Sequence, residues 1–308
     1  MEAEKLSIIM PAYNEGQSIG PVIQQLRALY PDAEVIVIDD GSTDETAQAA
    51  LREGAKVFRH PYNIGNGAAI KSGIRAASGE LLLFMDADGQ HDPADVERLV
   101  SCLADYDMAV GSRTKQGQAS PGRAIGNRIY NLFASYVAKF PIKDLTSGFR
   151  AVKAGIAREF LYLLPNTYSY PTTLTLGVLR TGRSLVYVPV QTRKREKGKS
   201  NIKFFRDGTR FFMIIIRICT FYAPMRVFLP VSFATFLLGL INYAITYFTE
   251  GRFTNMSALL FVTAVLVFMM SLISEQICQL RFERRERRVS LQAVDRRENP
   301  PAESGWVE

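Results

Sequence analysis

Short apolar segments alternate with segments of helical spacing through the first 190 residues of the chain. A short apolar run bounded by polar turn residues is typical of a buried strand. Such runs lie at residues 6–10, where Pro11 is expected to end the strand, and at 35–38, 81–85, 108–111 and 185–190. Residues 56–59, Lys-Val-Phe-Arg, are expected to form a further short strand. Helical spacing is found at residues 17–29, 43–53, 66–77, 93–103 and 123–140. This alternation predicts an α/β fold with a mixed, mostly parallel sheet and helices on both faces.

Two long apolar runs follow, at residues 227–248 and 256–274. Neither contains Lys, Arg, Asp or Glu, and each is close to the ~20 residues that a helix needs to cross a bilayer. They predict a transmembrane hairpin, and the alternative is a pair of buried core helices. Arginines gather between Arg281 and Arg288, so the positive-inside rule places the C-terminus in the cytoplasm. Two crossings place the N-terminal domain there too, which predicts a multi-pass protein of the inner (plasma) membrane.

The segment before the hairpin combines aromatic residues with a basic stripe. Arg206, Arg210 and Arg217 fall on one face of a helix predicted over residues 203–222. This pattern favours a helix lying in the bilayer interface, and the alternative is an amphipathic helix packed on the domain. We therefore expect the chain to divide into four regions. They are an α/β domain (1–202), an interfacial helix region (203–226), the hairpin (227–280) and a basic tail (281–308) whose composition predicts disorder.

Charge and cysteine usage narrow the class of protein. The net charge is +7, and basic residues concentrate at residues 193–217 and 281–297, which indicates an anionic surface or ligand near the second half of the chain. No nucleic-acid partner is expected. Three scattered cysteines and two histidines exclude a disulfide framework and a His-rich metal site, so a reducing compartment is expected. The first residues also lack the pattern of a signal peptide.

Two carboxylates follow the apolar run at 81–85, namely Asp86 and Asp88. Residues two apart in an extended segment point the same way, so both can converge on one point, and Gln90 can join them if the chain stays extended. Oxygen ligands of this kind suit Mg²⁺ or Mn²⁺. The alternative is a solvated Asp-rich turn. The metal interpretation is favoured because ligands bind at the carboxyl ends of strands in open α/β sheets.

Three further motifs follow other predicted strands or open a helix. They are Pro11-Ala12-Tyr13-Asn14-Glu15, Asp39-Asp40-Gly41-Ser42 and the Gly-rich turn Asn63-Ile64-Gly65-Asn66-Gly67. A carboxylate after a parallel strand often binds a ribose or base edge, and a Gly-rich turn at a helix start often holds phosphate. The turn is neither a Rossmann fingerprint, since Ile70 replaces the third glycine, nor a P-loop.

Together these motifs resemble the family-2 glycosyltransferases of GT-A fold. Within that family the chain is similar to the polyprenyl-phosphate glycosyltransferases, which include dolichol-phosphate mannose synthase and the bacterial enzymes that load sugars on undecaprenyl phosphate. The similarity extends to Gly111-Ser112-Arg113, to the segment Asp144–Arg150 and to the basic loop at 193–203. The only tryptophan is Trp306, so the Gln-x-x-Arg-Trp motif of processive polymerases of the family is missing and a polymerase is not expected.

The resemblance implies a role for individual residues. Those that would bind the nucleotide sugar are Pro11, Tyr13, Glu15, Asp39, Asp40, Asp86 and Ala87. Those that would bind Mg²⁺ or Mn²⁺ are Asp86, Asp88 and Gln90, and those that would take part in catalysis are Asp88, Asp144 and Arg113. The acceptor phosphate would be held by Arg113, Arg123, Arg195 and Lys203. Asp144 has three open roles: it could orient the acceptor or a nearby arginine, accept a proton, or cap the following turn.

The implied activity is an inverting, metal-dependent transfer of one hexose, mannose or glucose, from a GDP- or UDP-linked donor such as GDP-mannose or UDP-glucose. The acceptor would be polyprenyl (dolichyl or undecaprenyl) phosphate at the cytoplasmic membrane face. The lipid phosphate, whose second pKa is near 6 by analogy with protein phosphates, needs no strong base. Alternatives are another lipid acceptor, such as a diacylglycerol or a lipid-linked saccharide, and a non-catalytic membrane-anchored binding subunit. Related members suggest a homo-oligomer such as a tetramer.

Overall fold

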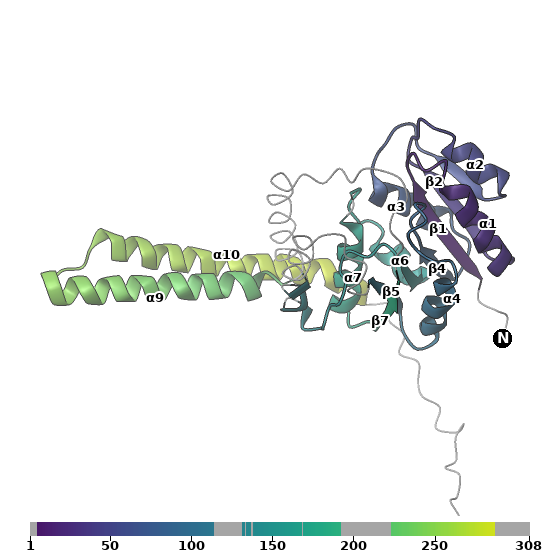
Figure 1. Ribbon diagram of the computed structural model, residues 1–308. Helices are drawn as coiled ribbons and strands as arrows, with labels where there is room; N and C mark the ends of the chain where they lie inside the picture. Colours follow the sequence, from purple (N-terminus) through teal and green to yellow (C-terminus); the bar gives the residue numbers. More distant parts are fainter. Residues whose placement is uncertain are drawn as a thin grey trace, which may run out of the picture.

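The structure is a computed structural model that describes residues 5–113, 131–132, 134–136, 138–167, 169–191 and 223–286, with side chains described as far as Leu280. It consists of an α/β domain from which a long helical hairpin extends to one side (Figure 1). The predicted interfacial helix at 203–222 and the tail beyond residue 286 lie outside the described residues, so the division into four regions stays a prediction.

The described part of the α/β domain contains a seven-stranded sheet in the order β3-β2-β1-β4-β6-β5-β7. Its strands are β1 (Leu6–Ala12), β2 (Glu34–Asp39), β3 (Lys56–Arg59), β4 (Leu81–Phe84), β5 (Met108–Arg113), β6 (Arg150–Lys153) and β7 (Leu185–Val190). Neighbouring strands are parallel except at β6, which is antiparallel to both β4 and β5. The prediction of a mixed, mostly parallel sheet is therefore confirmed.

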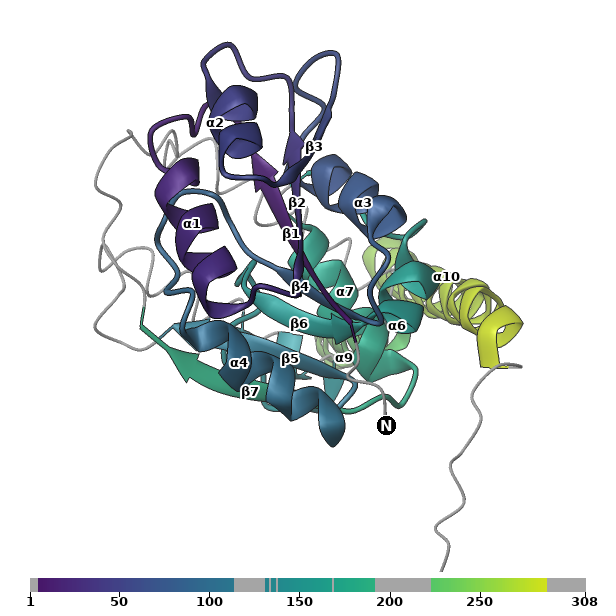
Figure 2. The ribbon, with the colours of Figure 1, turned by 90° about the vertical axis from the view of Figure 1, so that its right-hand side faces the viewer.

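Helices cover both faces of the sheet, as predicted (Figure 2). On one face lie α1 (Ile19–Leu29), α2 (Thr46–Arg52), α4 (Asp95–Val100) and the short 3-10 helix η1 (Ser101–Ala104). On the other lie α3 (Asn66–Ala76), α6 (Ala154–Phe160) and α7 (Tyr170–Arg180). Successive strand residues alternate between the two cores, so Ile8 packs on the first face and Ile9 on the second.

Strand β1 continues past Pro11, so the prediction that it ends there was wrong. Pro11 pairs with Ile38 of β2, and Ala12 pairs with Asp39. On its other side, β1 pairs with β4 only as far as Ile9, whose carbonyl accepts from Met85 N. The backbone hydrogen bonds between β1 and β4 therefore end before Pro11. The missing N–H of Pro11 costs none of these bonds.

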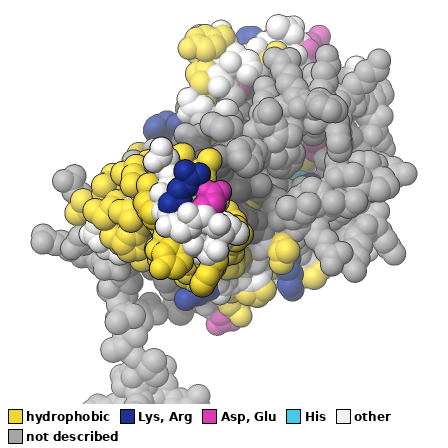
Figure 3. Space-filling view, turned by 90° about the vertical axis from the view of Figure 1, so that its left-hand side faces the viewer, with side chains coloured by type: hydrophobic (Ala, Val, Ile, Leu, Met, Phe, Trp, Pro, Cys, Tyr) yellow, Lys and Arg dark blue, Asp and Glu magenta, His cyan; other side chains and the backbone are white. Residues whose placement is uncertain are grey.

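Helices α9 (Pro224–Glu250) and α10 (Asn255–Glu286) form the hairpin, and each is long and apolar enough to cross a membrane. Gly239 allows close approach, since a Cβ built there would lie 3.2 Å from Leu260 Cβ, and Ser232 Oγ donates to Ala264 O at 2.8 Å across the helices. Glu250 and Arg252 form an ion pair where α9 ends and the chain turns toward α10. Apolar side chains cover the outside of the hairpin (Figure 3). This exposure contradicts the alternative of two buried core helices.

Candidate active site

The predicted site residues that the structure describes lie at or directly after the carboxyl ends of β1, β2, β4 and β5, or in the loop that leads into β6. This edge is where open α/β sheets bind ligands. The residues form two groups, one around the loops after β1 and β2 and one around the loops after β4 and β5. Arg123, Arg195 and Lys203, which were predicted to hold the acceptor phosphate, lie outside the described residues.

The loops after β1 and β2 are tied together by hydrogen bonds that the sequence interpretation missed. Asn14 N donates to Ser42 Oγ at 2.9 Å, and Thr43 N donates back to Asn14 Oδ1 at 2.8 Å. Asn14 has a φ of 56°, a left-handed conformation that Asn tolerates better than most residues. These bonds fix the backbone beside Tyr13, a residue that is 46% exposed and can therefore pack on a flat ligand.

Glu15 is held at the start of α1. Its backbone N donates to Thr46 Oγ1 at 2.9 Å, and its Oε2 accepts from Ser18 Oγ at 2.7 Å. Asn, Ser and Thr residues directly after predicted strands were the signal that could have identified this network, because short polar side chains commonly bond to nearby backbone in loops.

Asp39 lies at the end of β2 and is almost fully buried. Its Oδ1 accepts from Ser42 N at 2.9 Å. Its Oδ2 lies 3.2 Å from Arg59 Nε in an ion pair but accepts no hydrogen bond from the described residues. A buried carboxylate oxygen with spare acceptor capacity suits a hydroxyl or N–H donor of a ligand.

Asp40 holds the Gly-rich turn in place. Its Oδ1 accepts from Ile64 N at 3.0 Å and lies 2.7 Å from His60 Nδ1, and its Oδ2 accepts from Gly65 N at 2.8 Å. With both oxygens bonded within the protein, Asp40 has a structural role, and its contact with the nucleotide sugar stays a prediction.

The Gly-rich turn does not present an open phosphate cradle, which corrects the expectation from sequence. A Cβ on Gly67 would lie 2.1 Å from Pro165 O, and one on Gly65 would lie 2.3 Å from Asn166 O. The Asn166 carbonyl also accepts from Ala68 N in the first turn of α3. These glycines are therefore needed because another backbone segment packs directly on the turn.

The segment after β4 turns instead of staying extended, so the condition attached to Gln90 is not met. Gly89 has a φ of 70°, and Gln90 N donates to Asp88 Oδ1 at 3.1 Å. Ala87 is buried in the core below the turn, while Asp86 and Asp88 are partly exposed. The two carboxylates therefore lie in one turn at the edge of the sheet.

These residues fit a hard divalent ion. Asp86 and Asp88 supply carboxylate oxygens, and the described residues contain no group of three His, Cys, Asp or Glu that could enclose a metal. Mg²⁺ is typically bound by one or two carboxylates together with waters and substrate phosphates. Asp86 also lies against the loop before β6, where a Cβ on Gly148 would come within 3.0 Å of its Oδ2.

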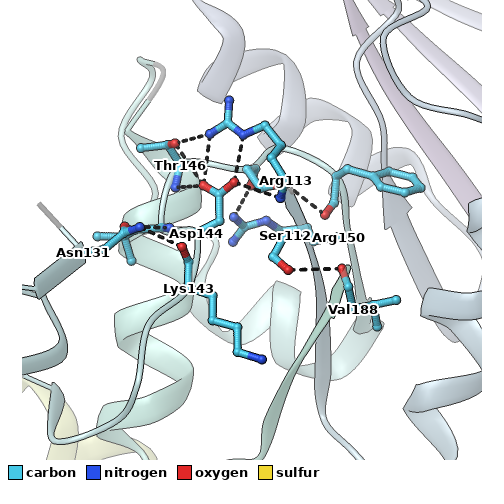
Figure 4. A network of polar contacts seen from close by, with 11 residues as sticks. Ser112, Arg113, Asn131, Lys143, Asp144, Thr146, Arg150 and Val188 are labelled. Atoms are coloured by element: carbon cyan, nitrogen blue, oxygen red, sulfur yellow. Dashed lines mark hydrogen bonds and ion pairs between the residues drawn. The ribbon is translucent and has the colours of Figure 1, made fainter. Parts of the chain in front are cut away.

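Arg113 and Asp144 form a two-pronged ion pair beside this turn (Figure 4). Arg113 Nε donates to Asp144 Oδ2 at 2.8 Å, and Nη2 donates to Oδ1 at 3.0 Å and to Thr146 Oγ1 at 2.6 Å. The hydrogen bonds to Asp144 raise the pKa of Arg113, with a smaller contribution from the charge on Asp86. Asp86 and the ion pair therefore share one electrostatic environment.

The pKa of Asp144 is lowered. Burial alone would raise it, but the hydrogen bonds and charge of Arg113, together with the N–H of Thr146, outweigh burial. A carboxylate with a lowered pKa is a weaker proton acceptor. Two of the three roles left open by the sequence fit this geometry: Asp144 orients Arg113, and its Oδ1 accepts from Thr146 N at 3.2 Å, which caps the following turn.

Two further residues near the Arg113–Asp144 pair, His91 and Arg150, were not assigned a role in the sequence analysis. His91 stacks on Phe149 with ring centroids 4.7 Å apart, and burial lowers its pKa. Arg150 is fully buried and donates to Pro171 O at 2.8 Å and to Thr175 Oγ1 at 3.1 Å. The sequence signal for Arg150 was its place at the end of the family-like segment Asp144–Arg150, which gave it no individual role.

Known structures share this fold. Glucosyl-3-phosphoglycerate synthase from Mycobacterium tuberculosis, solved with Mn²⁺ and uridine-diphosphate-glucose, aligns with a TM-score of 0.57 at 22% identity, covering 71% of this chain and 79% of that one. The α/β domain is thus of the GT-A type. The profile of Glycosyl transferase family 2 matches residues 7–161, and that of the GtrB C-terminal hairpin matches residues 223–280. The chain belongs to glycosyl transferase family 2, which confirms the resemblance found in the sequence.

Two relatives of this chain are named as enzymes that act on polyprenyl phosphates. The undecaprenyl-phosphate mannosyltransferase of Micrococcus luteus is 28% identical over 63% of this chain and 86% of its own length. The dodecaprenyl-phosphate galacturonate synthase of Rhizobium johnstonii is 29% identical over 73% of this chain and 69% of its own length. These relatives are named for different sugars.

Proposed function

We propose that the protein transfers a single hexose from a nucleotide sugar to a polyprenyl phosphate at the membrane surface, with inversion at the sugar. The observation that carries the proposal is the combination of the Arg113–Asp144 pair, beside the Asp86–Asp88 turn, with a hairpin able to cross a membrane. The polyprenyl-phosphate relatives support the choice of acceptor.

On the donor side, Tyr13 and Asp39 have the surfaces that a nucleoside needs. An exposed ring can stack on the base, and the Asp39 carboxylate can accept hydrogen bonds from the base or ribose. Asp86 and Asp88 would hold Mg²⁺ or Mn²⁺, which when bound neutralises charge on the departing nucleoside diphosphate. Solved structures of the same fold that contain Mn²⁺ or Mg²⁺ support this assignment.

On the acceptor side, Arg113 would bind the lipid phosphate. Nε and Nη2 donate to Asp144 and Thr146, so the guanidinium is fixed in one orientation, and Nη1 would contact the phosphate. A phosphate oxygen then attacks C1 of the sugar while the bond from C1 to the diphosphate oxygen breaks. Most of a phosphate monoester is already dianionic at neutral pH, so no proton has to be removed.

The low pKa of Asp144 favours this acceptor over a neutral hydroxyl. A diacylglycerol or sugar hydroxyl would require a general base near the attacking oxygen. Asp144 is the carboxylate closest to Arg113, and its pairing makes it poorly suited to that task. The second candidate, transfer to a neutral lipid, therefore has less support. The cytoplasmic orientation and the tetramer stay predictions.

The test uses the full chain in nanodiscs with undecaprenyl phosphate or diacylglycerol as acceptor. Each acceptor is incubated with Mn²⁺ and a panel of nucleotide sugars, including GDP-mannose, UDP-glucose and UDP-galacturonic acid. Mass spectrometry is expected to find one sugar added to the lipid phosphate with one donor. A product on diacylglycerol alone, or no lipid product with any donor, overturns the proposal.

A further inference from the structure

The carboxylate of Glu275 lies where the hairpin meets the α/β domain. Glu275 of α10 falls within the apolar span Asn255–Leu280, yet its side chain is only 16% exposed. Its Oε1 accepts from Arg180 Nη2 at 3.0 Å, and its Oε2 accepts from Met225 N at 3.4 Å. Glu275 thereby joins three helices: its own, the last turn of α7 and the first turn of α9.

Both contacts suit a negative charge. Arg180 is a full cation, and Met225 N is one of the backbone N–H groups that the first turn of α9 leaves without an intrahelical partner. Ionisable side chains within membrane-spanning segments are costly and tend to be functional. The cost at Glu275 is offset by these partners, which come from the domain and from the other arm of the hairpin.

Further contacts hold the same junction. Tyr136 OH donates to Arg226 O at 3.1 Å, and Arg226 Nη1 donates back to Tyr136 O at 3.3 Å. Ala223, directly before α9, is buried in the core that contains Leu174 and Val178 of α7. The start of α9 is therefore fixed to the α/β domain.

Helix α7 connects this junction to the candidate active site. Its 11 residues span ~16 Å at 1.5 Å per residue. At its other end, Pro171 O and Thr175 Oγ1 bind the Arg150 guanidinium, and the Tyr170 hydroxyl lies 3.4 Å from the Cβ position of Gly148. Asp86 Oδ2 lies 3.0 Å from that same position. One rigid helix thus runs from the membrane hairpin to the loop that packs against Asp86.

We propose that Glu275 is a positioning residue. By pairing with Arg180 and the start of α9, it fixes the angle between the hairpin and the α/β domain, so that the active site faces the phosphate of an acceptor held in the bilayer. The identity of that acceptor rests on the proposed function. The geometry of the junction does not depend on it.

This role has a specific kinetic signature. A displaced domain meets a membrane-bound acceptor less often in the productive orientation, whereas a water-soluble acceptor can approach from any direction. Glu275→Gln keeps the size of the side chain and an acceptor oxygen for Met225 N but removes the charge. We expect kcat/KM for undecaprenyl phosphate in nanodiscs to fall about tenfold, mainly through KM. With geranyl phosphate, a short water-soluble acceptor, the change is expected to stay within about twofold.

Two further variants control for loss of folding. Glu159→Gln breaks the Arg183–Glu159 ion pair, whose atoms lie 2.6 Å apart with similar exposure but entirely within the α/β domain, and both acceptors should react as with the wild type. The exchanged pair, Arg180→Glu with Glu275→Arg, restores opposite charges and is expected to recover part of the nanodisc activity.

A second measurement needs no substrate. Spin labels at exposed Tyr162 in the domain and exposed Leu238 in the hairpin report their distance distribution by double electron–electron resonance. Glu275→Gln is expected to broaden it, and Glu159→Gln is not. The proposal is overturned if Glu275→Gln matches the wild type in both measurements, or if it lowers activity equally with both acceptors. If the wild-type protein reacts with neither acceptor, the proposed function fails, and the distance measurement still decides the positioning role.

Discussion

Arg113 and Asp144 are 31 residues apart in sequence, yet their side chains meet in two parallel hydrogen bonds of 2.8 and 3.0 Å. The paired geometry fixes the plane of the guanidinium, which a single contact would not do. Because the Asp86–Asp88 turn lies in the same electrostatic environment, an arginine oriented in this way can hold an anionic acceptor near the donor diphosphate.

Removing the charge of Asp144 should therefore reduce catalysis without weakening donor binding. We expect Asp144→Asn to lower kcat by roughly 100-fold, because Arg113 loses its fixed orientation, and to leave donor affinity within about threefold. Steady-state kinetics measure kcat, and calorimetric titration with the nucleoside diphosphate measures the affinity. Asp107→Asn is the matched control, since it disrupts the Lys153–Asp107 pair far from the site and should change neither quantity.

The pH profile separates the orienting role of Asp144 from a proton-accepting role. A lowered pKa keeps Asp144 ionised from neutral pH down to below its ordinary range, so it contributes no change in rate between about pH 5 and 8. The fall in rate near pH 6 should instead follow the second ionisation of the acceptor phosphate. Asp144→Asn is expected to lower the plateau and leave this acidic limb in place. Disappearance of the limb in the variant would show that Asp144 is the base.

Asp88 gives a test of metal binding that does not depend on turnover. Asp88→Asn removes a charge from the proposed ligand set, and we expect it to weaken the Mn²⁺-dependent binding of the nucleoside diphosphate by roughly 30-fold or more. Isothermal titration with and without Mn²⁺ measures the loss. Asp95→Asn, which breaks a surface pair with Arg98, should bind as the wild type does. Equal nucleotide affinity with and without Mn²⁺ in the wild type would contradict the ligand assignment.

Gly67 and Gly155 provide a matched pair for the packing of the Gly-rich turn. A Cβ on Gly67 would lie 2.1 Å from Pro165 O and 2.6 Å from Thr167 O, whereas one on Gly155 would meet nothing within 4 Å. Gly67→Ala should lower the free energy of unfolding by about 2–3 kcal/mol, because backbone must move to admit the methyl group. Gly155→Ala should leave it unchanged or raise it by up to ~1 kcal/mol. Thermal unfolding in detergent compares the two, and equal midpoints would show that the turn is not packed as described.

Most strands that could be predicted from sequence have continuous apolar runs, and the edge strand β3, Lys-Val-Phe-Arg, is the exception. A central parallel strand buries both faces, so its sequence alone is sufficiently apolar to identify it. Strand β6 was missed because its sequence, Arg-Ala-Val-Lys, is short and charged at both ends and, unlike the equally short β3, Lys-Val-Phe-Arg, contains no aromatic residue of high strand propensity. Its burial comes from pairing with β4 and β5 on either side, which depends on distant segments. Helix α7 was missed because buried threonines replace an amphipathic stripe.

The residues of the candidate site could be predicted from sequence, but the contacts between them could not. Asp86, Asp88, Arg113 and Asp144 were all identified from motifs, yet no spacing in the sequence shows that Arg113 and Asp144 pair. The Gly-rich turn shows that a sequence motif can also suggest a binding role that the tertiary structure does not allow. Its glycines suggested phosphate binding, but the carbonyls of residues 165–167 occupy that space, and only the tertiary fold brings them there.

Glu34 gives a prediction for stability against pH. Its carboxylate, almost fully buried, accepts from Lys56 Nζ, from Ser7 Oγ at 2.6 Å and from Ser78 N at 2.9 Å. Burial alone would raise the pKa of Glu34, but these hydrogen bonds outweigh burial and lower it to about 2. A lowered pKa stabilises the folded state above the ordinary pKa of a glutamate, near 4.3, and this contribution is lost as the pH falls toward 2.

Glu34→Gln should therefore lower the free energy of unfolding at pH 7 by about 2 kcal/mol, a value reduced from the full pKa shift because Lys56 is largely exposed. The wild-type protein should lose this contribution between about pH 4.5 and 2, whereas the variant should not. Thermal unfolding midpoints across this pH range measure the difference. Glu45→Gln is the control, because the Arg52–Glu45 pair is exposed on both sides and should contribute little at any pH. Parallel pH dependence in the wild type and Glu34→Gln would show that the hydrogen bonds to Glu34 do not stabilise its charged form.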